Sequence, residues 1–330
     1  MAVISPSASV KLLDATFESC SALQELFQPL SPDLVALQLS SGILKGRVQA
    51  WGFEGFRLNL LNTNQTLFLS GSRRPECCTL ALALNPSEGD GAYKAQGVTM
   101  PWPGLMGYNH GLIDFDLRLP AGAQLATVVL SKAACLDRHG QLIGPLMMKR
   151  WEQTNQLQVR APLRDQLQRQ LMALIHGRAD SEQTLDPDQV MQSLIQCFEN
   201  PAAQTMPIAK REARHQAAIE LLHWCAKNPK SPLKIEEMSG AIFQSRTSLF
   251  KGSREHFQRT PLELHRSIRL DRVRQLLLNP RQRHNQGLTG VSSIVEEMGF
   301  SSRSHFARRY EQHFHELPRE TLMRSHTQAA

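Results

Sequence analysis

The chain has 330 residues, of which 41% are hydrophobic and 20% charged. This is the length of about two domains and the composition of a globular protein, which excludes disordered, collagen-like and coiled-coil classes. No apolar run reaches the ~18 residues of a membrane span, and the first ten residues lack a basic cluster followed by an apolar block. We therefore expect a cytoplasmic protein without membrane contact, whose six cysteines are reduced.

The net charge of +7 is located at one end of the chain. Residues 211–330 carry 20 Lys and Arg against 12 Asp and Glu, whereas residues 1–210 carry 17 against 18. A basic surplus confined to one segment indicates a polyanion partner for that segment, or a solvated basic surface. Charge alone leaves both interpretations open.

Residues 33–130 alternate between apolar and other side chains. Apolar residues recur at every second position, and turn-forming residues separate the segments, which are 35–39, 56–60, 80–84, 115–119 and 128–130. Period two predicts half-buried strands, and short strands at this spacing are typical of a barrel or a sandwich.

The pattern becomes helical from about Leu157. One helix carries Leu163, Leu167, Leu171 and Leu174 on a single stripe, and Asp186-Pro187 is expected to open a second helix. Such a stripe packs either against the strands or against a second copy of the chain, and both interpretations remain open.

The C-terminal part contains one pattern twice, from Ile235 to Pro261 and from Val291 to Pro318. Each copy has a short helix, a tight turn, and a longer helix that opens on Ser followed by Arg. This arrangement predicts two helix-turn-helix units.

The second copy fits this pattern throughout. Gly299 suits a turn that needs a positive φ, Ser301 or Ser302 can cap the longer helix, and aromatic residues recur every fourth position to form its buried face. Side chains off that face are expected to contact DNA bases, namely Arg303, Ser304, His305 and Arg308, while Arg309 is expected to contact a phosphate.

The first copy departs from the pattern. Phe243 takes the turn position of Gly299, where positive φ strains a bulky residue, and Gly252-Ser253 stands where the second copy has Tyr310. Phe243 or Phe250 is expected to fill the resulting space. Expected base contacts are Thr247, Ser248, Phe250 and Lys251, and expected phosphate contacts are Arg246 and Arg254.

A helix over 261–278 is predicted to connect the copies, with Leu264, Ile268 and Val273 buried. A rigid connector of this length would hold two reading helices about one DNA turn, ~34 Å, apart. Arg272 and Arg274 on this helix are expected to clamp phosphates.

These residues resemble the DNA-binding domain of the AraC/XylS family of transcription regulators. The resemblance rests on 235–278, on Gly299-Phe300 through Phe306, Tyr310 and Phe314, and on Leu317-Pro318. The run from Glu316 to Leu322 is most similar to the branch that includes the ethanolamine-utilisation regulator. The departures from the family pattern are those of the first copy and His315, where the family favours Gly.

The resemblance implies a non-enzymatic α+β protein that binds promoter DNA, most often an activator, with RNA polymerase as a further partner. It implies three parts: a β-rich, cupin-like sensor barrel over 1–156, a helical linker that can dimerise over 157–208, and the double helix-turn-helix domain over 209–330. It also implies a small-molecule effector for the first part and no cofactor.

The sequence offers a pocket but no metal centre in this N-terminal part. The apolar, turn-rich segment 100–108 suggests a pocket built from Phe56, Trp102, Tyr108 and His110. His110 is the sole histidine of residues 1–138, so no histidine-rich metal site is predicted. Two other functions stay open: a small-molecule enzyme of the barrel class with a basic accessory half, and an interaction module that binds polyanions or acidic proteins without sequence preference.

Overall fold

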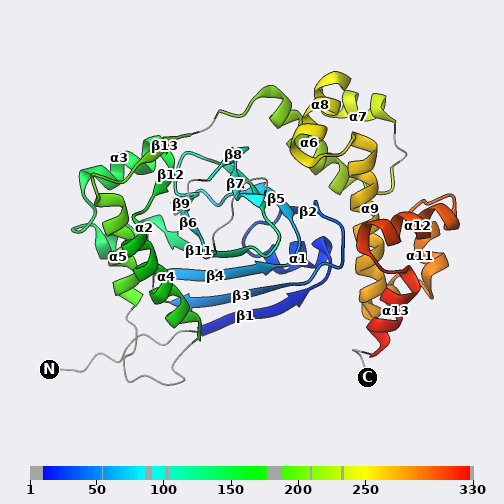
Figure 1. Cartoon of the computed structure of the whole chain (residues 1–330), viewed down its shortest axis with the longest axis horizontal. Helices are drawn as coiled ribbons and strands as arrows, with labels where there is room; N and C mark the ends of the chain where they lie inside the picture. Colours follow the sequence, from blue (N-terminus) through cyan, green and yellow to red (C-terminus); the bar gives the residue numbers. More distant parts are fainter. Residues whose placement is uncertain are drawn as a thin grey trace.

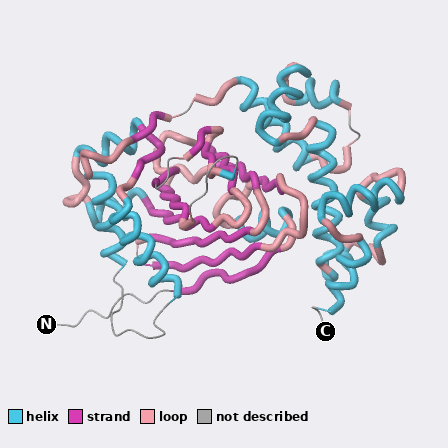
Figure 2. The backbone as a smooth tube through the Cα atoms, viewed as in Figure 1, coloured by secondary structure: helices cyan, strands magenta, loops and turns pink. Residues whose placement is uncertain are grey.

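The computed structural model describes residues 10–53, 55–85, 91–100, 104–176, 187–208, 210–231 and 234–327. Strands gather in the N-terminal half, and the C-terminal half is helical (Figures 1 and 2). The α+β class is therefore confirmed. No helix in these ranges is long and apolar enough to cross a membrane.

The strands form two antiparallel sheets. In spatial order the larger sheet contains β1 (Val10–Phe17), β3 (Gly46–Phe53), β4 (Phe56–Thr63), β11 (Gln124–Ser131), β6 (Cys77–Ala83), β9 (Gly104–Met106), β12 (Thr154–Gln158) and β13 (Thr205–Pro207). The smaller sheet contains β2 (Val35–Gln38), β5 (Leu67–Ser72), β10 (Asp114–Leu119), β7 (Lys94–Ala95) and β8 (Val98–Thr99). The barrel or sandwich that the strand pattern predicts is thus present as two sheets that share a core, with no closed barrel among the described strands.

Two cores lie on the two faces of the larger sheet. One face carries large side chains such as Leu58, Leu80 and Val128, which pack against the helices that cover it. The opposite face shares a core with the smaller sheet and with α1 (Cys20–Phe27). The covering helices are α3 (Pro145–Gln153), α4 (Ala161–His176) and α5 (Pro187–Glu199), and α2 (Lys132–His139) follows β11.

The leucine stripe of α4 belongs to the core of the N-terminal half. Leu167 and Leu171 are buried against the larger sheet, and Leu163 is partly buried there. The side chain of Leu174 and residue Asp186 lie outside the described residues. The described part of the stripe packs on strands of its own chain, so the dimer-seam interpretation is wrong for these leucines.

The C-terminal half consists of helices from Ala213 onward. They are α6 (Ala213–Lys227), α7 (Ile235–Ala241), α8 (Arg246–Phe257), α9 (Pro261–Leu278), α10 (Pro280–Asn285), α11 (Val291–Glu297), α12 (Arg303–Phe314) and α13 (Pro318–Thr327). Figure 1 shows α9 running from the group formed by α6, α7 and α8 to the group formed by α11, α12 and α13.

Candidate nucleic-acid interface

The second helix-turn-helix unit, α11 and α12, has the predicted geometry. Gly299 adopts φ +71° in the turn, and the Ser302 side chain accepts the backbone N–H of His305 at the start of α12. Phe306, Tyr310 and Phe314 are buried, with neighbouring ring centroids 5.6 and 4.7 Å apart. The four-residue aromatic spacing thus sets which side of α12 faces inward.

The opposite side of α12 is open to solvent. Its exposed side chains include the five predicted DNA contacts, Arg303, Ser304, His305, Arg308 and Arg309, and also Glu311 and Gln312. Arg303 forms an exposed ion pair with Glu296 of α11 at 2.5 Å. An exposed pair contributes ~0–1 kcal/mol, so this guanidinium can exchange its partner at little cost.

The turn of the first unit, α7 and α8, contains an exposed Phe243. Phe243 has φ +52°, as its alignment with Gly299 predicts. The expectation that it fills the space beside α8 is wrong, because 94% of its surface is exposed. Phe250 is also exposed. The Ser245 side chain caps α8 by accepting the backbone N–H of Ser248 at 3.1 Å.

Helix α6 fills the space beside α8. A Cβ at Gly252 would lie 2.1 Å from the backbone oxygen of Arg214 and 3.3 Å from the Cβ of Ala218. Ser253 is also fully buried. The mid-helix Gly-Ser pair therefore permits a close helix crossing.

The remaining predicted contacts of the first unit are mostly exposed. Thr247, Lys251 and Arg254 are open to solvent, and Ser248 is half-buried with its hydroxyl bonded to Ser245. Arg246 forms an exposed ion pair with Glu236 of α7 at 3.0 Å. Each unit therefore presents a basic, solvent-facing second helix.

The connecting helix α9 belongs to the cores of both units. Thr260 and Glu263 form a capping box at its start, and Pro261 occupies its first turn. Leu264 and Ile268 pack with the first unit, whereas Val273 packs with the second. All three are buried as predicted. Because α9 is one continuous helix of 18 residues, ~27 Å long, it fixes the relative position of the units.

The assignment of Arg274 to a DNA phosphate is wrong. Its side chain is 0% exposed and pairs with the Glu316 carboxylate. It also donates from Nε to the backbone oxygen of Glu18 at 2.6 Å and lies 4.7 Å from the ring centroid of Phe314. A buried guanidinium needs such partners, and they come from distant parts of the chain. Arg272, two residues earlier, is half-buried.

Helix α9 also contacts the N-terminal half directly. The Asp271 carboxylate accepts the backbone N–H groups of Cys20 and Ser21 at 2.7 and 2.8 Å and the Ser21 hydroxyl at 2.6 Å. A carboxylate at this position stabilises the first turn of α1, where backbone N–H groups are otherwise unpaired. Gln275, one turn later, accepts a hydrogen bond from the Ser19 hydroxyl.

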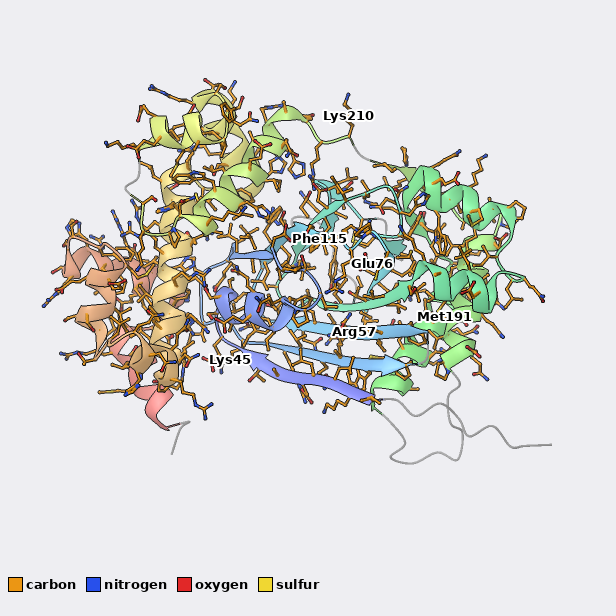
Figure 3. The ribbon with its side chains drawn as sticks, turned by 180° about the vertical axis from the view of Figure 1, so that it is seen from behind. Lys45, Arg57, Glu76, Phe115, Met191 and Lys210 are labelled. Atoms are coloured by element: carbon orange, nitrogen blue, oxygen red, sulfur yellow. The ribbon has the colours of Figure 1, made fainter. Side chains whose placement is uncertain are left out.

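A cavity of about 150 Å³ lies between the two sheets. Leu61, Leu69, Phe115 and Leu117 form part of its apolar wall, and Asn59, Thr79 and Thr127 add polar groups. Figure 3 shows Phe115 among the strands of the N-terminal half.

The predicted pocket residues do not line this cavity. Tyr108 and Phe56 are buried in the core beneath α3, α4 and α5, His110 is exposed, and Trp102 lies outside the described residues. Burial raises the pKa of Tyr108 to about 12, which is the behaviour of a core hydroxyl. The predicted pocket is therefore wrong as a set.

A polar cluster joins the cavity to the helical half. Asp114 and Asp116 of β10 line the cavity and pair with Arg211, at 2.7 and 2.8 Å, just before α6. Asp116 also lies 3.4 Å from Nε2 of His215 on α6, whose ring stacks on His256 of α8 at 4.0 Å between centroids. Burial and the neighbouring His215 lower the pKa of His256 to about 4.

A family model described as a helix-turn-helix domain matches residues 238–324, which span both units and α9. The chain is also 26% identical over 102 residues to the XylDLEGF operon transcriptional activator 2 of Pseudomonas putida. Residues 238–324 are therefore a helix-turn-helix domain. The match covers 31% of this chain and 62% of that relative, which is less than two thirds of its length.

Solved structures are similar to parts or most of the chain. A probable AraC family transcriptional regulator from Rhodopseudomonas palustris is 27% identical, with 33% of this chain and 97% of that chain covered and a TM-score of 0.30. The AraC-like transcriptional activator CuxR is 13% identical, with 84% and 97% covered and a TM-score of 0.39. ToxT from Vibrio cholerae is 13% identical, with 96% and 98% covered and a TM-score of 0.32.

Proposed function

We propose that this protein is a sequence-specific DNA-binding transcription regulator that acts as an effector-responsive activator. The observation that carries the proposal is the pair of exposed basic helices, α8 and α12, held on one continuous connecting helix. Helix-turn-helix proteins place such helices in the major groove, where Arg reads guanine edges.

The two helices have distinct tasks in this proposal. Arg303, Ser304, His305 and Arg308 read bases in one groove, with Arg309 on a phosphate. Thr247, Ser248, Phe250 and Lys251 read bases in the next groove. Arg246, Arg254 and the half-buried Arg272 contact the backbone.

The N-terminal half has a regulatory role. We assign the small-molecule effector to the cavity between the sheets, and the Asp116–Arg211–His215 cluster transmits its occupancy to α6. We retain 209 as the start of the DNA-binding domain and 1–156 as the sensor. The segment 157–208 covers the outer face of the sensor sheet through α4 and α5. Contact with RNA polymerase, dimerisation, a cytoplasmic location and the ethanolamine-utilisation branch remain predictions.

Selection of binding sites from random double-stranded DNA with the full chain tests the proposal. We expect one enriched motif in two parts, spaced by about one DNA turn. Arg308→Ala should relax preference at particular positions and cost about 1–3 kcal/mol on the selected site. Arg169→Ala, an exposed arginine on α4 of the sensor half, is the matched control and should bind as the unaltered chain does.

Salt dependence separates base reading from charge attraction. Arg309→Ala should weaken binding to all sequences alike and lower the slope of log affinity against log salt by about 0.9. Equal retention of every DNA sequence, with no enriched motif, would overturn the proposal and favour a polyanion-binding module. Equal behaviour of Arg308→Ala and Arg169→Ala would overturn the assigned reading face.

A further inference from the structure

The cavity between the sheets arises from a size difference between the two faces of the larger sheet. Leu58, Leu80 and Val128 face the covering helices, whereas their strand neighbours Asn59, Thr79 and Thr127 face the cavity. Thr127 is paired in register with Asn59 on one side and with Ala81 on the other. Asn59, Thr127 and Ala81 thus form a row of short side chains across β4, β11 and β6, and this row leaves space that large residues would fill.

The cavity has the dimensions of a small apolar ligand. An apolar cavity of ~150 Å³ holds one benzene-sized molecule. The smaller sheet closes the space with Leu69, Phe115 and Leu117, and the segment after α1 adds Leu30 and Leu34. An occupant therefore needs an apolar body of about six carbon atoms.

One end of the cavity carries positive charge. Arg73 follows β5 directly, lines the cavity, and donates to the backbone oxygens of Asn109, at 2.8 Å, and Gly107. No carboxylate in the described ranges forms an ion pair with it. A guanidinium has five N–H donors, so donors remain for a ligand. Arg74 lies beside it on the rim.

The two acidic residues of the cavity pair with a cation from the helical half. Asp114 and Asp116 share the guanidinium of Arg211, which comes from the segment before α6. Arg73 and the exposed Arg74 are the cavity-lining cations that form no ion pair within the described ranges, and the half-buried Arg73 loses part of its hydration. A half-buried cation of this kind favours an anionic partner.

We propose that the cavity binds a small monocarboxylic acid, with its apolar body between the two sheets and its carboxylate on Arg73. The inference names the chemical class of the effector, and the role of this ligand in regulation rests on the proposed function. The ligand carboxylate supplies the ion pair that Arg73 lacks, and the short side chains of Asn59, Thr79 and Thr127 provide room for the body. The same cavity is bordered by Asp116, so the ligand lies next to the contact with α6.

Calorimetric titration of the full chain without DNA tests this inference. The probes are hexanoate and hexanamide, which have the same chain length and differ in charge. We expect hexanoate to bind about 10–100-fold more tightly, the ratio that a charge-assisted hydrogen-bond pair supplies. Arg73→Gln should abolish this preference. The matched control, Arg118→Gln on β10 of the same small sheet, removes a charge that does not line the cavity and should retain the preference.

A second variant tests the location without altering charge. Thr127→Leu places a larger side chain in the floor of the cavity and should weaken both probes at least tenfold, while circular dichroism confirms the native sheet content. Equal affinity for hexanoate and hexanamide, a preference retained in Arg73→Gln, or unchanged binding in Thr127→Leu would each overturn the inference. The selection of DNA sites is carried out without ligand and tests the proposed function separately. An enriched DNA motif together with no hexanoate binding would therefore overturn the ligand class and leave the proposed function standing.

Discussion

Replacing Gly252 by alanine tests the close crossing of α6 and α8. The new Cβ would lie 2.1 Å from the backbone oxygen of Arg214, and contacts below 3.0 Å are essentially absent for real Cβ atoms. The two helices must therefore separate by about 1 Å at this point. Overpacking of this kind costs about 1–3 kcal/mol.

The same substitution has an opposing, local effect. Alanine is favoured over glycine within a helix by ~1 kcal/mol. Because the new Cβ would meet backbone atoms of α6 rather than the end of a flexible side chain, the clash cannot be relieved locally. We therefore place the overpacking cost in the upper part of its range, at about 2–3 kcal/mol, and expect a net loss of about 1–2 kcal/mol in the free energy of unfolding.

Urea unfolding monitored by circular dichroism measures this loss. The matched control is Gly240→Ala on α7, where an added Cβ meets nothing within 4 Å. That control should gain about 0.5–1 kcal/mol. If Gly252→Ala were as stable as the unaltered chain, or gained stability as the control does, the described helix crossing would be refuted.

Three further predictions concern the C-terminal half. His315 ends α12 with φ +55°, so His315→Gly should raise the free energy of unfolding by roughly 0.5–1 kcal/mol in urea titrations, and an equal gain in His315→Ala would contradict this cause. Arg274→Met removes the buried cation beside Glu316, which keeps Arg324 and the Thr321 hydroxyl as partners, and should cost roughly 3 kcal/mol, the lower end for a broken buried pair. The salt slope of DNA binding should stay unchanged, because a changed slope would mean that Arg274 contacts a phosphate. Burial lowers the pKa of His313 to about 3, from about 6.5 in the unfolded chain, so the unfolded state binds a proton first as the pH falls. The free energy of unfolding should therefore decrease between pH 6.5 and pH 3, by up to ~1.4 kcal/mol per pH unit. His313→Gln should make this decrease smaller in urea unfolding midpoints measured across that range.

The second helix-turn-helix unit could be predicted because its signals are local. A turn glycine, a capping serine and aromatic residues every four positions each act within one or two helical turns. In the first unit the positive φ of Phe243 followed from alignment with Gly299. The role of Gly252 did not, because it depends on α6, more than thirty residues earlier in the chain.

The errors concern contacts between distant segments. Arg272 and Arg274 lie two residues apart on α9 and are alike in the sequence, but Glu18 and Glu316 pair with Arg274 and not with Arg272. The pocket was assigned to aromatic residues, whereas the cavity lies where Asn59 and Thr127 are short. Which strand face meets helices and which meets the other sheet is set by the packing of whole layers, and the alternation of size along β4 and β11 was the available signal.

The carboxylate of Asp271 has a consequence for chimeric proteins. It belongs to the spacer between the two units, yet it completes the first turn of a helix in the other half of the molecule. If the N-terminal half were joined to the C-terminal half of another protein, α1 would lose the carboxylate of Asp271. The C-terminal half left behind would keep Asp271 without the backbone N–H groups of Cys20 and Ser21 that it accepts. We therefore expect exchange of parts between proteins of this design to preserve the contact only where residues 18–25 and 271–275 are transferred together.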